Sequence, residues 1–546
     1  PLPTPAPVFP APLPGLRETG KGTYTYTFVT VLPENFDRNA THVVGGYVTR
    51  ATRAFVSNPV FEFVPAGGEV KVTRRVVATA SCDQCHNPIQ IHGGTRRDTK
   101  LCVLCHTAQN IDPESSNTAD LKVMAHKIHR GRNLPSVAVG KKDYFIVGNA
   151  QNLFDFSKIG LPQDIRNCTT CHGRPPAGVK AEDYGKLAPQ ADNYKNAPSA
   201  AACGACHDNI DFATGKARFG GRDHPGGPQA NDNLCKVCHQ ADSGQEFDTS
   251  IVGAHTIPER SKQLKGVKLT LMAANLKPGE KPSVDFHIQD NAGAFIDPNK
   301  MSFLELTIAH PTTDYAHRIT DMVNQIVAPP APAFVRAGAL VKLDMPGEHY
   351  RYTFKDPLDK DWKVTAAVGM AGYKSSTIKG NEGKDTVVRE ADINPVIYVS
   401  LDGSKVAPRR TVVKRDNCNQ CHLDLGNPAG ISLHGGVRRN TEYCILCHNP
   451  NLTDESRRLA RGGEMPPESV HYKYMIHSLH MGEERAVAAR FGTRADTTRV
   501  FFPTPGKQKN CSKCHEGLSY TIPLPAGVLP TTVTQSGKVI SVTQPI

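Results

Sequence analysis

No stretch of about 18 or more apolar residues occurs in the 546-residue chain, which argues against a transmembrane helix. No cysteine lies outside a Cys-x-x-Cys-His unit, so none remains for a structural disulfide, a zinc site, a thiol nucleophile or a lipid-bearing N-terminal cysteine. The chain does not open with a charged region followed by an apolar one, and we expect that a signal peptide has been removed.

The 16 cysteines form eight Cys-x-x-Cys-His units, and this pattern is the most informative feature of the sequence. Two thiols three positions apart reach the two vinyl groups of one porphyrin, and the next residue turns its imidazole under the ring to bind iron. A single unit would also fit a zinc knuckle or a redox dithiol. Eight units that use every cysteine favour covalently attached haem, and we expect eight haem c groups. The units, each given as two thioether cysteines and a proximal histidine, are Cys82, Cys85 and His86; Cys102, Cys105 and His106; Cys168, Cys171 and His172; Cys203, Cys206 and His207; Cys235, Cys238 and His239; Cys418, Cys421 and His422; Cys444, Cys447 and His448; and Cys511, Cys514 and His515.

The units are densely spaced, with five between Cys82 and His255 and three between Cys418 and His515. About 35 residues per unit cannot bury a conventional hydrophobic core. We therefore expect the porphyrins to form the core and to lie against one another. The single tryptophan of the chain agrees with a core that the cofactor supplies.

Eight of the 22 histidines complete these units, which leaves 14 for other roles. Each group of units has at least one spare histidine per haem within or just after it, so we predict that two histidines bind every iron. Methionine is the rival axial ligand, but Met124 and Met475 lie at helical core spacing, where packing is expected. The predicted distal ligands are His92, His126, His129, His224, His255, His434, His477 and His480, with His471 as a surplus candidate.

Two of these pairs, His126 with His129 and His477 with His480, lie three residues apart on predicted helices. Residues at this spacing share one helix face, so one helix could serve two closely packed haems. Gly131 and Gly482 follow, as glycines do at helix C-termini. By contrast, four histidines lie in strand-rich sequence and are not expected to be ligands; they are His287, His310, His317 and His349.

The formal charge of +12 does not by itself indicate nucleic-acid binding. No run of five Lys or Arg residues occurs, and no basic patch is interleaved with aromatic residues. Eight ferric haems with two propionates each would add about −8, which leaves about +4. The basic residues are therefore expected to offset propionates.

The two groups of units repeat one another. His92 lies ten residues before Cys102, as His434 lies before Cys444, and both are followed by Gly-Gly-x-Arg-Arg-x-Thr. Strand-like sequence precedes each copy: Tyr24-Thr-Tyr-Thr-Phe28 matches Tyr350-Arg-Tyr-Thr-Phe354, and alternating residues occur in Val284–Ile288 and Phe303–Ile308. We predict β-barrel-like or sandwich-like domains that alternate with multihaem domains of low regular secondary structure.

The predicted boundaries are a short β domain with a Pro-rich arm (1–77), a pentahaem domain (78–258), a β domain (259–413), a trihaem domain (414–520) and a β-like tail (521–546).

This arrangement resembles the OmcA/MtrC family of outer-membrane multihaem cytochromes c. The residues that carry the resemblance are the first two units with His92-Gly-Gly-x-Arg, the paired helical histidines, and Pro311-Thr-Thr-Asp-Tyr315. The resemblance implies a secreted protein at a Gram-negative-type outer surface. It implies electron transfer from a partner to minerals, flavins, electrodes or other cytochromes. Familiar members have ten haems in two sets of five, often an N-terminal lipid and sometimes a disulfide; here the second set lacks two haems.

The ends of the chain suggest a route to assembly. The chain begins Pro1-Leu-Pro-Thr-Pro, which indicates polyproline II, and Thr531 to Ile546 reads as a hairpin around Ser536-Gly537. Only about 60 residues, from Lys21 to Ser81, precede the first haem unit, and a small β domain leaves open sheet edges. We hypothesise that a tail completes a β domain of a neighbouring subunit by strand addition, which would generate a head-to-tail cytochrome filament, or nanowire.

We interpret the chain as an electron-transfer protein and not an enzyme: an octahaem cytochrome in which electrons hop between closely packed haems. One alternative is a multihaem oxidoreductase that reduces a nitrogen or sulfur oxyanion at one open iron site. Another is a monomeric periplasmic electron shuttle. The expected partners are donor and acceptor cytochromes or mineral surfaces, with no nucleic acid.

Overall fold

The computed structural model describes residues 15–71, 73–176, 178–327, 333–462, 465–485, 490–491, 495–496, 500, 502, 510–535 and 538–542. The chain divides into two compact units. One consists of Pro1–Gly46 and Pro59–Thr73, and the other of Tyr47–Asn58 and Arg74–Ile546.

The first compact unit contains two small antiparallel sheets, in which β1 pairs with β2 and β3 pairs with β6. Their bounds are β1 Leu16–Gly20, β2 Thr23–Tyr26, β3 His42–Gly45 and β6 Val60–Phe63. Every residue of β1 and β2 is exposed. The predicted strand around Tyr24 is therefore present, but two-stranded sheets bury little of their apolar surface. In the second compact unit, β4 (Val48–Arg50) pairs with β5 (Phe55–Ser57).

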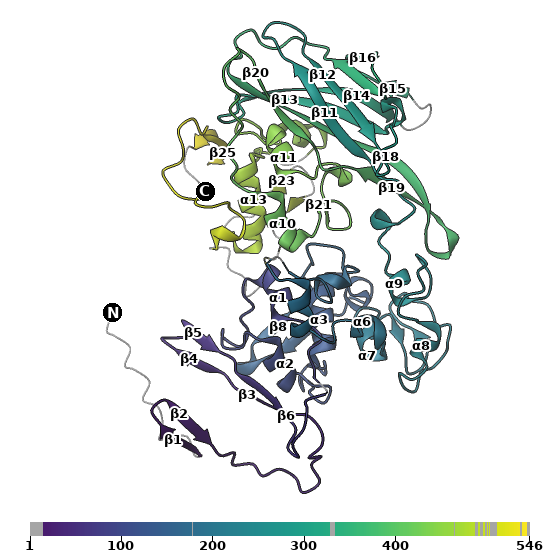
Figure 1. Ribbon diagram of the computed structural model, residues 1–546, viewed down its shortest axis with the longest axis vertical. Helices are drawn as coiled ribbons and strands as arrows, with labels where there is room; N and C mark the ends of the chain where they lie inside the picture. The colour runs from purple at the N-terminus through teal and green to yellow at the C-terminus, as the bar shows by residue number, and fades with distance from the viewer. Residues whose placement is uncertain are drawn as a thin grey trace. The chain divides into compact units, whose positions relative to one another are not determined.

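Residues 268–400 form a β-sandwich of two antiparallel sheets, drawn in teal and green in Figure 1. One sheet has the order β11-β12-β17-β16; the other has β15-β14-β13-β18-β19, and β20 also pairs with β18. The strands are β11 Lys268–Asn275, β12 Ser283–Gln289, β13 Phe303–His310, β14 His317–Val327, β15 Ala333–Val335, β16 Ala339–Lys342, β17 His349–Thr353, β18 Thr365–Lys379, β19 Asp385–Ala391 and β20 Val396–Ser400. The strands predicted at Val284–Ile288 and Phe303–Ile308 are confirmed as β12 and β13.

The core between the two sheets follows from the alternation of the strands. In β12, Val284, Phe286 and Ile288 are all fully buried, whereas the residues between them are only partly covered. A half-buried strand shows this period of two. The single tryptophan, Trp362, lies in this core and is 6% exposed, so the sandwich has a conventional hydrophobic core of its own.

The central strands of the six-stranded sheet, β13 and the first half of β18, are buried on both faces, because a helix of the following segment covers the outer side there. Nearly every residue of β13 is buried. Tyr443 and Leu446 of helix α11 (Thr441–Cys447) pack against this face. A Cβ atom on Gly369 of β18 would lie 2.6 Å from the Leu446 side chain, so the helix can approach this closely only where the strand carries glycine.

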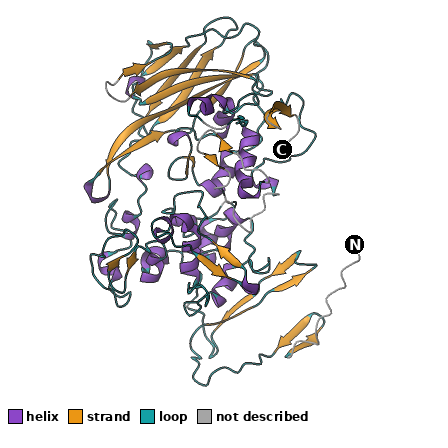
Figure 2. Ribbon diagram, turned by 180° about the vertical axis from the view of Figure 1, so that it is seen from behind, coloured by secondary structure: helices purple, strands orange, loops and turns teal. Residues whose placement is uncertain are grey.

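The segment with the first five units, residues 78–258 (the five-motif segment), has short helices and little sheet. Figure 2 shows the longest strands gathered in the sandwich, shorter strands elsewhere, and the helices spread over the two segments that carry the motifs. The α-helices are α1 Thr79–His86, α2 Thr99–Cys105, α3 Leu121–Arg130, α4 Pro135–Ala138, α5 Ala181–Leu187, α6 Asn193–Asn196, α7 Ala200–Gly204, α8 Cys235–Cys238 and α9 Ile251–Ala254. The 3-10 helices are η1 Gly131–Asn133, η2 Asn149–Gln151 and η3 Cys168–Thr170, with η4 Pro258–Arg260 at the end. The strands are β7 Phe145–Val147, β8 Leu153–Asp155, β9 Ile210–Asp211 and β10 Lys216–Ala217.

The segment with the last three units, residues 414–520 (the three-motif segment), has the same character. Its α-helices are α10 Arg415–His422, α11, α12 Glu455–Ala460 and α13 Tyr472–Met481. Its 3-10 helices are η7 His434–Gly436, η8 Gly482–Glu484 and η10 Cys511–Lys513, and its strands are β21 Leu425–Gly426, β22 Ile431–Ser432, β23 Arg490–Phe491 and β24 Ala495–Asp496. A terminal hairpin follows, β25 Thr531–Gln535 with β26 Lys538–Val542. Residues 536 and 537, where the hairpin turn is predicted, lie outside the described residues.

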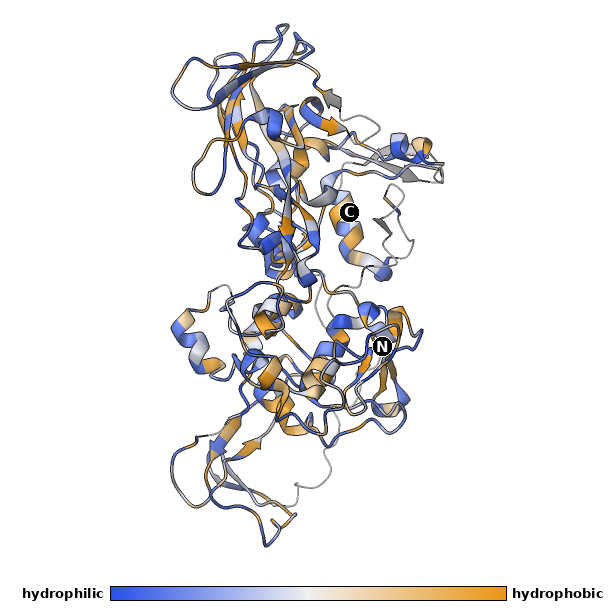
Figure 3. Cartoon of the chain, turned by 90° about the vertical axis from the view of Figure 1, so that its right-hand side faces the viewer, coloured by the Kyte–Doolittle hydropathy of each residue, from blue (hydrophilic) through white to orange (hydrophobic). Residues whose placement is uncertain are grey.

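The helices predicted around the paired histidines are confirmed as α3 and α13. Each ends at a glycine with positive φ, Gly131 (43°) and Gly482 (54°), as the sequence predicts. These two helices have 10 residues each, and none in the described part of the chain has the length and apolar character to cross a bilayer. Figure 3 shows hydrophobic and hydrophilic residues mixed along the helices.

Candidate functional site

Each of the eight Cys-x-x-Cys-His units lies on a helix or a single 3-10 turn. A helical turn puts residues i and i+3 on one face, so the two sulfur atoms of a unit point the same way. In the second unit the backbone N–H of His106 donates to the carbonyl of Cys102 (2.9 Å). The corresponding bonds in the third, fourth, fifth, seventh and eighth units measure 2.9–3.0 Å. The local fold therefore holds the histidine at a fixed position relative to both cysteines.

Every unit histidine faces one histidine from elsewhere in the same segment, and the eight partners are the eight predicted distal residues. The ring centroids lie 5.9–6.3 Å apart in all eight cases. The pairs are His86–His129, His106–His92, His172–His126, His207–His255, His239–His224, His422–His480, His448–His434 and His515–His477.

This separation has a chemical meaning. An imidazole nitrogen binds a first-row metal at about 2.0–2.1 Å, so two imidazoles opposite one another on a single metal have centroids about 6.3 Å apart. The angle between the two ring planes varies from 15° for His477–His515 to 76° for His86–His129. Two axial ligands can take any such angle about their common axis. The spacing is constant while the angle is not, which is what a shared metal requires and what direct ring stacking does not.

Among the described residues, at least nine of these sixteen histidines form a hydrogen bond through the second ring nitrogen. Eight donate from Nδ1 to a backbone carbonyl at 2.7–3.1 Å: His106, His129, His224, His239, His255, His422, His448 and His480. His515 Nδ1 lies 3.2 Å from Ser519 Oγ, which itself donates to the carbonyl of Val412. A carbonyl can only accept, so Nδ1 carries the hydrogen and Nε2 keeps its lone pair, as metal ligation requires.

Burial also disfavours the protonated form of three of the paired imidazoles. It lowers the pKa of His172, His422 and His434 to about 4 in each case. Removal of the ring from water disfavours the protonated form. A neutral imidazole binds metal and an imidazolium does not, so the residues present fit a cofactor with two axial nitrogen ligands.

Helix α3 carries partners for two units, because His129 faces His86 and His126 faces His172. Its first N–H, that of Leu121, donates to the carbonyl of a third unit histidine, His106 (3.2 Å). Helix α13 repeats the design: His480 faces His422, and His477 faces His515. The N–H of Tyr472 donates to His448 O (3.0 Å). One ten-residue helix thus fixes three neighbouring units.

A single cavity of about 4300 Å³ runs through both segments. The paired histidines line it except for His92, His106 and His434, and cysteines of seven of the eight units line it as well. The unit that contributes no cysteine, the seventh, still contributes His448. The walls of the cavity are predominantly apolar. This lining suits flat hydrophobic rings that lie against one another.

The remaining histidines lie elsewhere. His471 is 5% exposed, and its Nδ1 is 2.7 Å from Thr531 Oγ1, so its ring faces the terminal hairpin and not a unit histidine. His287, His310, His317 and His349 lie on strands of the sandwich, where His310 stacks on Trp362 with centroids 4.8 Å apart. The backbone carbonyls that accept from the ring N–H groups were not predicted from the sequence. Every residue has a backbone carbonyl, so no residue type marks the acceptor.

Comparison with known proteins gives consistent results. Residues 74–252 and 410–543 match the family described as "Outer membrane cytochrome MtrC/MtrF-like, domains II/IV". A curated relative, "Multiheme cytochrome MtrC" from Shewanella baltica (strain OS185), is 27% identical over 240 residues. That match covers 42% of this chain and 29% of the relative, so the chain spans less than a third of it.

Two solved structures share the fold. The crystal structure of MtrC from Shewanella baltica OS185 has a TM-score of 0.60 with 19% identity, over 92% of this chain and 74% of that one. The outer membrane decaheme cytochrome OmcA has a TM-score of 0.64 with 19% identity, over 96% of this chain and 75% of that one. The predicted alternation of β domains with segments of short helices is confirmed by these matches.

Proposed function

The chain belongs to the MtrC/MtrF-like outer membrane cytochromes, and from this premise we propose that it is an octahaem c-type cytochrome that carries electrons outside the cell. The observation that supports the proposal most directly is the set of eight histidine pairs at 5.9–6.3 Å. Each pair consists of one unit histidine and one distal histidine. The sixteen cysteines would form the thioether links, and the sixteen paired histidines would be the axial ligands.

Bound haem c would supply one-electron chemistry, in which each transfer oxidises one iron and reduces its neighbour without making or breaking a bond. The protein would perform three tasks. The paired imidazoles would hold each iron in both oxidation states, the carbonyls bonded to Nδ1 would orient the imidazoles, and the apolar walls of the cavity would exclude water. The final acceptors would be mineral surfaces, electrodes, flavins or other cytochromes.

The paired histidines disfavour the reading of the chain as an oxyanion reductase. Such an enzyme needs one iron with an open coordination position, and that position would require a unit histidine with no histidine opposite it. All eight unit histidines have one.

The test is to count and characterise the haems in the purified protein. We expect eight covalently bound haems per chain, an entirely low-spin ferric spectrum, and reoxidation of the reduced protein by ferric oxide. A high-spin fraction that disappears on adding nitrite or hydroxylamine, with turnover of either, would instead support the reductase.

A finer proposal concerns assembly. Large apolar side chains near the N-terminal end are exposed, among them Tyr24 (59%), Phe28 (61%) and Phe61 (67%). These residues lie on or beside two-stranded sheets with open edges, which are templates for strand addition. We propose that the hairpin β25–β26 of a second copy adds to them and forms a filament. Deletion of residues 531–546 would then leave the haem content at eight but abolish filaments in electron micrographs. Unchanged filaments would contradict this proposal, and an intact protein that stays monomeric would favour the periplasmic electron shuttle.

A further inference from the structure

A loop of the five-motif segment reaches the first unit of the three-motif segment. This loop, residues 162–167 (the junction loop), makes three polar contacts across the boundary that involve a side chain, in addition to a backbone hydrogen bond from the N–H of Asp164 to the carbonyl of Ala429 (3.4 Å). His422 Nδ1 donates to the carbonyl of Pro162 (3.1 Å), Gln163 Nε2 donates to the carbonyl of Cys421 (3.1 Å), and Asn167 Nδ2 donates to the carbonyl of Ala429 (2.7 Å). The first two contacts hold the sixth Cys-x-x-Cys-His unit itself.

The hydrogen bond from His422 Nδ1 differs from those of the other paired histidines in where its acceptor lies. The eight other ring N–H groups described above bond to acceptors in their own segment; for example, His480 donates to Ile476 O and His129 to Ala125 O. The acceptor for His422 lies 260 positions away along the chain, in the other segment. The orientation of this one imidazole therefore depends on how the two segments meet.

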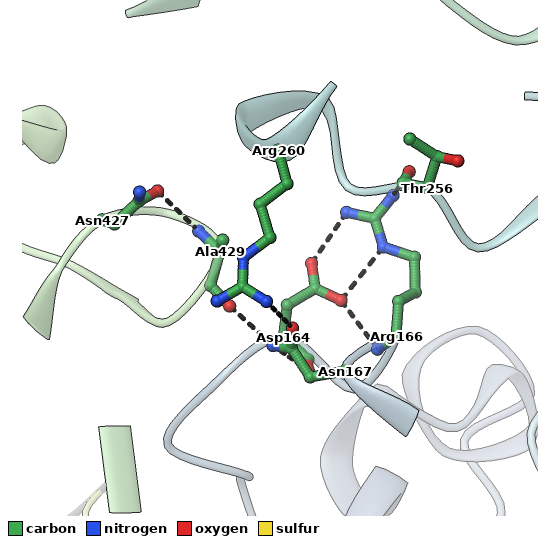
Figure 4. Close-up of polar contacts among 7 residues, drawn as sticks. All are labelled: Asp164, Arg166, Asn167, Thr256, Arg260, Asn427 and Ala429. Atoms are coloured by element: carbon green, nitrogen blue, oxygen red, sulfur yellow. Dashed lines mark hydrogen bonds and ion pairs between the residues drawn. The ribbon is translucent and has the colours of Figure 1, made fainter. Parts of the chain in front are cut away.

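The junction loop is held firmly enough to play this role. Asn167 also accepts from Arg260 Nη1 at its Oδ1 (3.0 Å), and the Asp164 carboxylate binds the Arg166 guanidinium (2.7 Å), as Figure 4 shows. On the opposite side, the N–H of Ala429 donates to Asn427 Oδ1 (3.0 Å). Gln163, Asn167 and Ala429 are 7%, 8% and 0% exposed. Water is largely excluded, so the polar groups have no easy substitute for these partners.

The hydrogen bond that an axial imidazole donates from Nδ1 affects the reduction potential of the metal bound at Nε2. A carbonyl that accepts the Nδ1 hydrogen makes the imidazole a better electron donor, which stabilises the oxidised metal and lowers its reduction potential. We propose that the junction loop is a positioning element that orients His422 and tunes the iron held by His422 and His480, so that the docking of the two segments also sets the potential of the first acceptor beyond the boundary. This inference rests on the proposed function.

The experiment uses the full-length holoprotein with Asn167→Ala and, as an independent variant, Gln163→Ala. Asn167→Ala removes the hydrogen bonds to Ala429 and Arg260, and Gln163→Ala removes those to Cys421 and Thr170; neither substitution changes an axial ligand. The repeat supplies a matched control: Asn510 occupies the equivalent position before the eighth unit, where its side-chain Oδ1 accepts a hydrogen bond from the Ser512 hydroxyl, two residues away (2.8 Å). The control variant is therefore Asn510→Ala.

We expect Asn167→Ala and Gln163→Ala to retain the haem content and low-spin spectrum of the wild type. In a spectroelectrochemical titration, one of the eight one-electron steps moves to higher potential. The hyperfine-shifted NMR signals of a single haem move with it, while Asn510→Ala leaves that haem unchanged. Titrations of both variants that superimpose on the wild type, or an identical shift in Asn510→Ala, would overturn the inference. Failure of the proposed function is distinguishable, because it would appear in the wild type as fewer than eight haems or as a high-spin signal.

Discussion

Cys85 and Cys421 meet across the boundary between the two motif-bearing segments in a reciprocal arrangement. The Cys85 sulfur lies 3.9 Å from the carbonyl oxygen of Gln420, and the Cys421 sulfur lies 3.6 Å from that of Gln84. Each residue is the second cysteine of the first unit in its copy of the repeat. Two similar surfaces that meet face to face give this exchange of contacts. The first and sixth units are thus neighbours, and under the proposed function they are where an electron would cross between the two segments.

Removal of one distal histidine should open one iron. With His129→Ala, the iron held by His86 loses its second axial nitrogen, because these rings face one another at 6.1 Å. We expect a high-spin ferric signal that amounts to about one eighth of the total iron, and binding of about one carbon monoxide per reduced molecule. Electron paramagnetic resonance and CO titration measure the two effects.

His471 provides the control for this experiment. Its ring contacts Thr531 and not a unit histidine, so His471→Ala should remain fully low-spin and bind no carbon monoxide. A high-spin fraction in His471→Ala would show that the surplus candidate is a ligand after all.

The stability of the holoprotein should decrease as the pH falls from about 6.5 to about 4, in part because of His471. Burial lowers the pKa of His471 to about 4, and in the unfolded chain an imidazole has a pKa of about 6.5. Between these values the unfolded state binds a proton that the folded state does not, so the free energy of unfolding falls, by about 3 kcal/mol over the window. Denaturant titrations of wild type and His471→Gln at pH 7 and pH 4 measure it. His471→Gln should reduce the loss of unfolding free energy between pH 7 and pH 4. Equal losses in both proteins would show that His471 does not cause it.

The potential of the haem at His477 and His515 should depend on Lys473. This lysine lies one helical turn before His477, its ammonium group is buried without a hydrogen-bond partner among the described residues, and burial lowers its pKa. A cation near the iron favours the reduced state, so Lys473→Met should lower one of the eight potentials. Lys122 is the matched control: it holds the equivalent place before His126, but it is half exposed and pairs with Asp120 at 3.7 Å. Spectroelectrochemistry should show a smaller change for Lys122→Met.

The contact between the sandwich and the three-motif segment should depend on a buried ion pair. Glu305 of β13 binds the Arg438 guanidinium and accepts a hydrogen bond from the Tyr443 hydroxyl (2.8 Å), and Glu305 is 6% exposed. Arg438→Met would leave a buried carboxylate without its cation and should destabilise the fold by about 3 kcal/mol or more. The double variant Glu305→Gln/Arg438→Met should recover much of this loss in denaturant titrations. A double variant as unstable as the single one would show that packing, not charge, dominates.

Much of the site was predictable because haem attachment has a local signature. The Cys-x-x-Cys-His spacing is a property of one helical turn, and the paired histidines of α3 and α13 follow from helix periodicity. The strands of the sandwich were predictable for the same reason, since alternation with a period of two is local. No local pattern, by contrast, marks residues 47–58 as part of the second compact unit, because their place there depends on contacts with residues far along the chain.

The number of units, their repeat, the residues available as ligands and the two helices with paired histidines can all be read from the sequence, because each depends on neighbours along the chain. Which histidine faces which depends instead on how distant parts of the chain pack together. His86 is six residues from His92 yet faces His129, and His239 faces His224 although His255 is almost as near. A ligand on the far side of a flat ring must come from chain that passes around the ring, and packing decides which segment does so. The contact of His422 with Pro162 could not be predicted for the same reason, because it exists only where two distant segments dock.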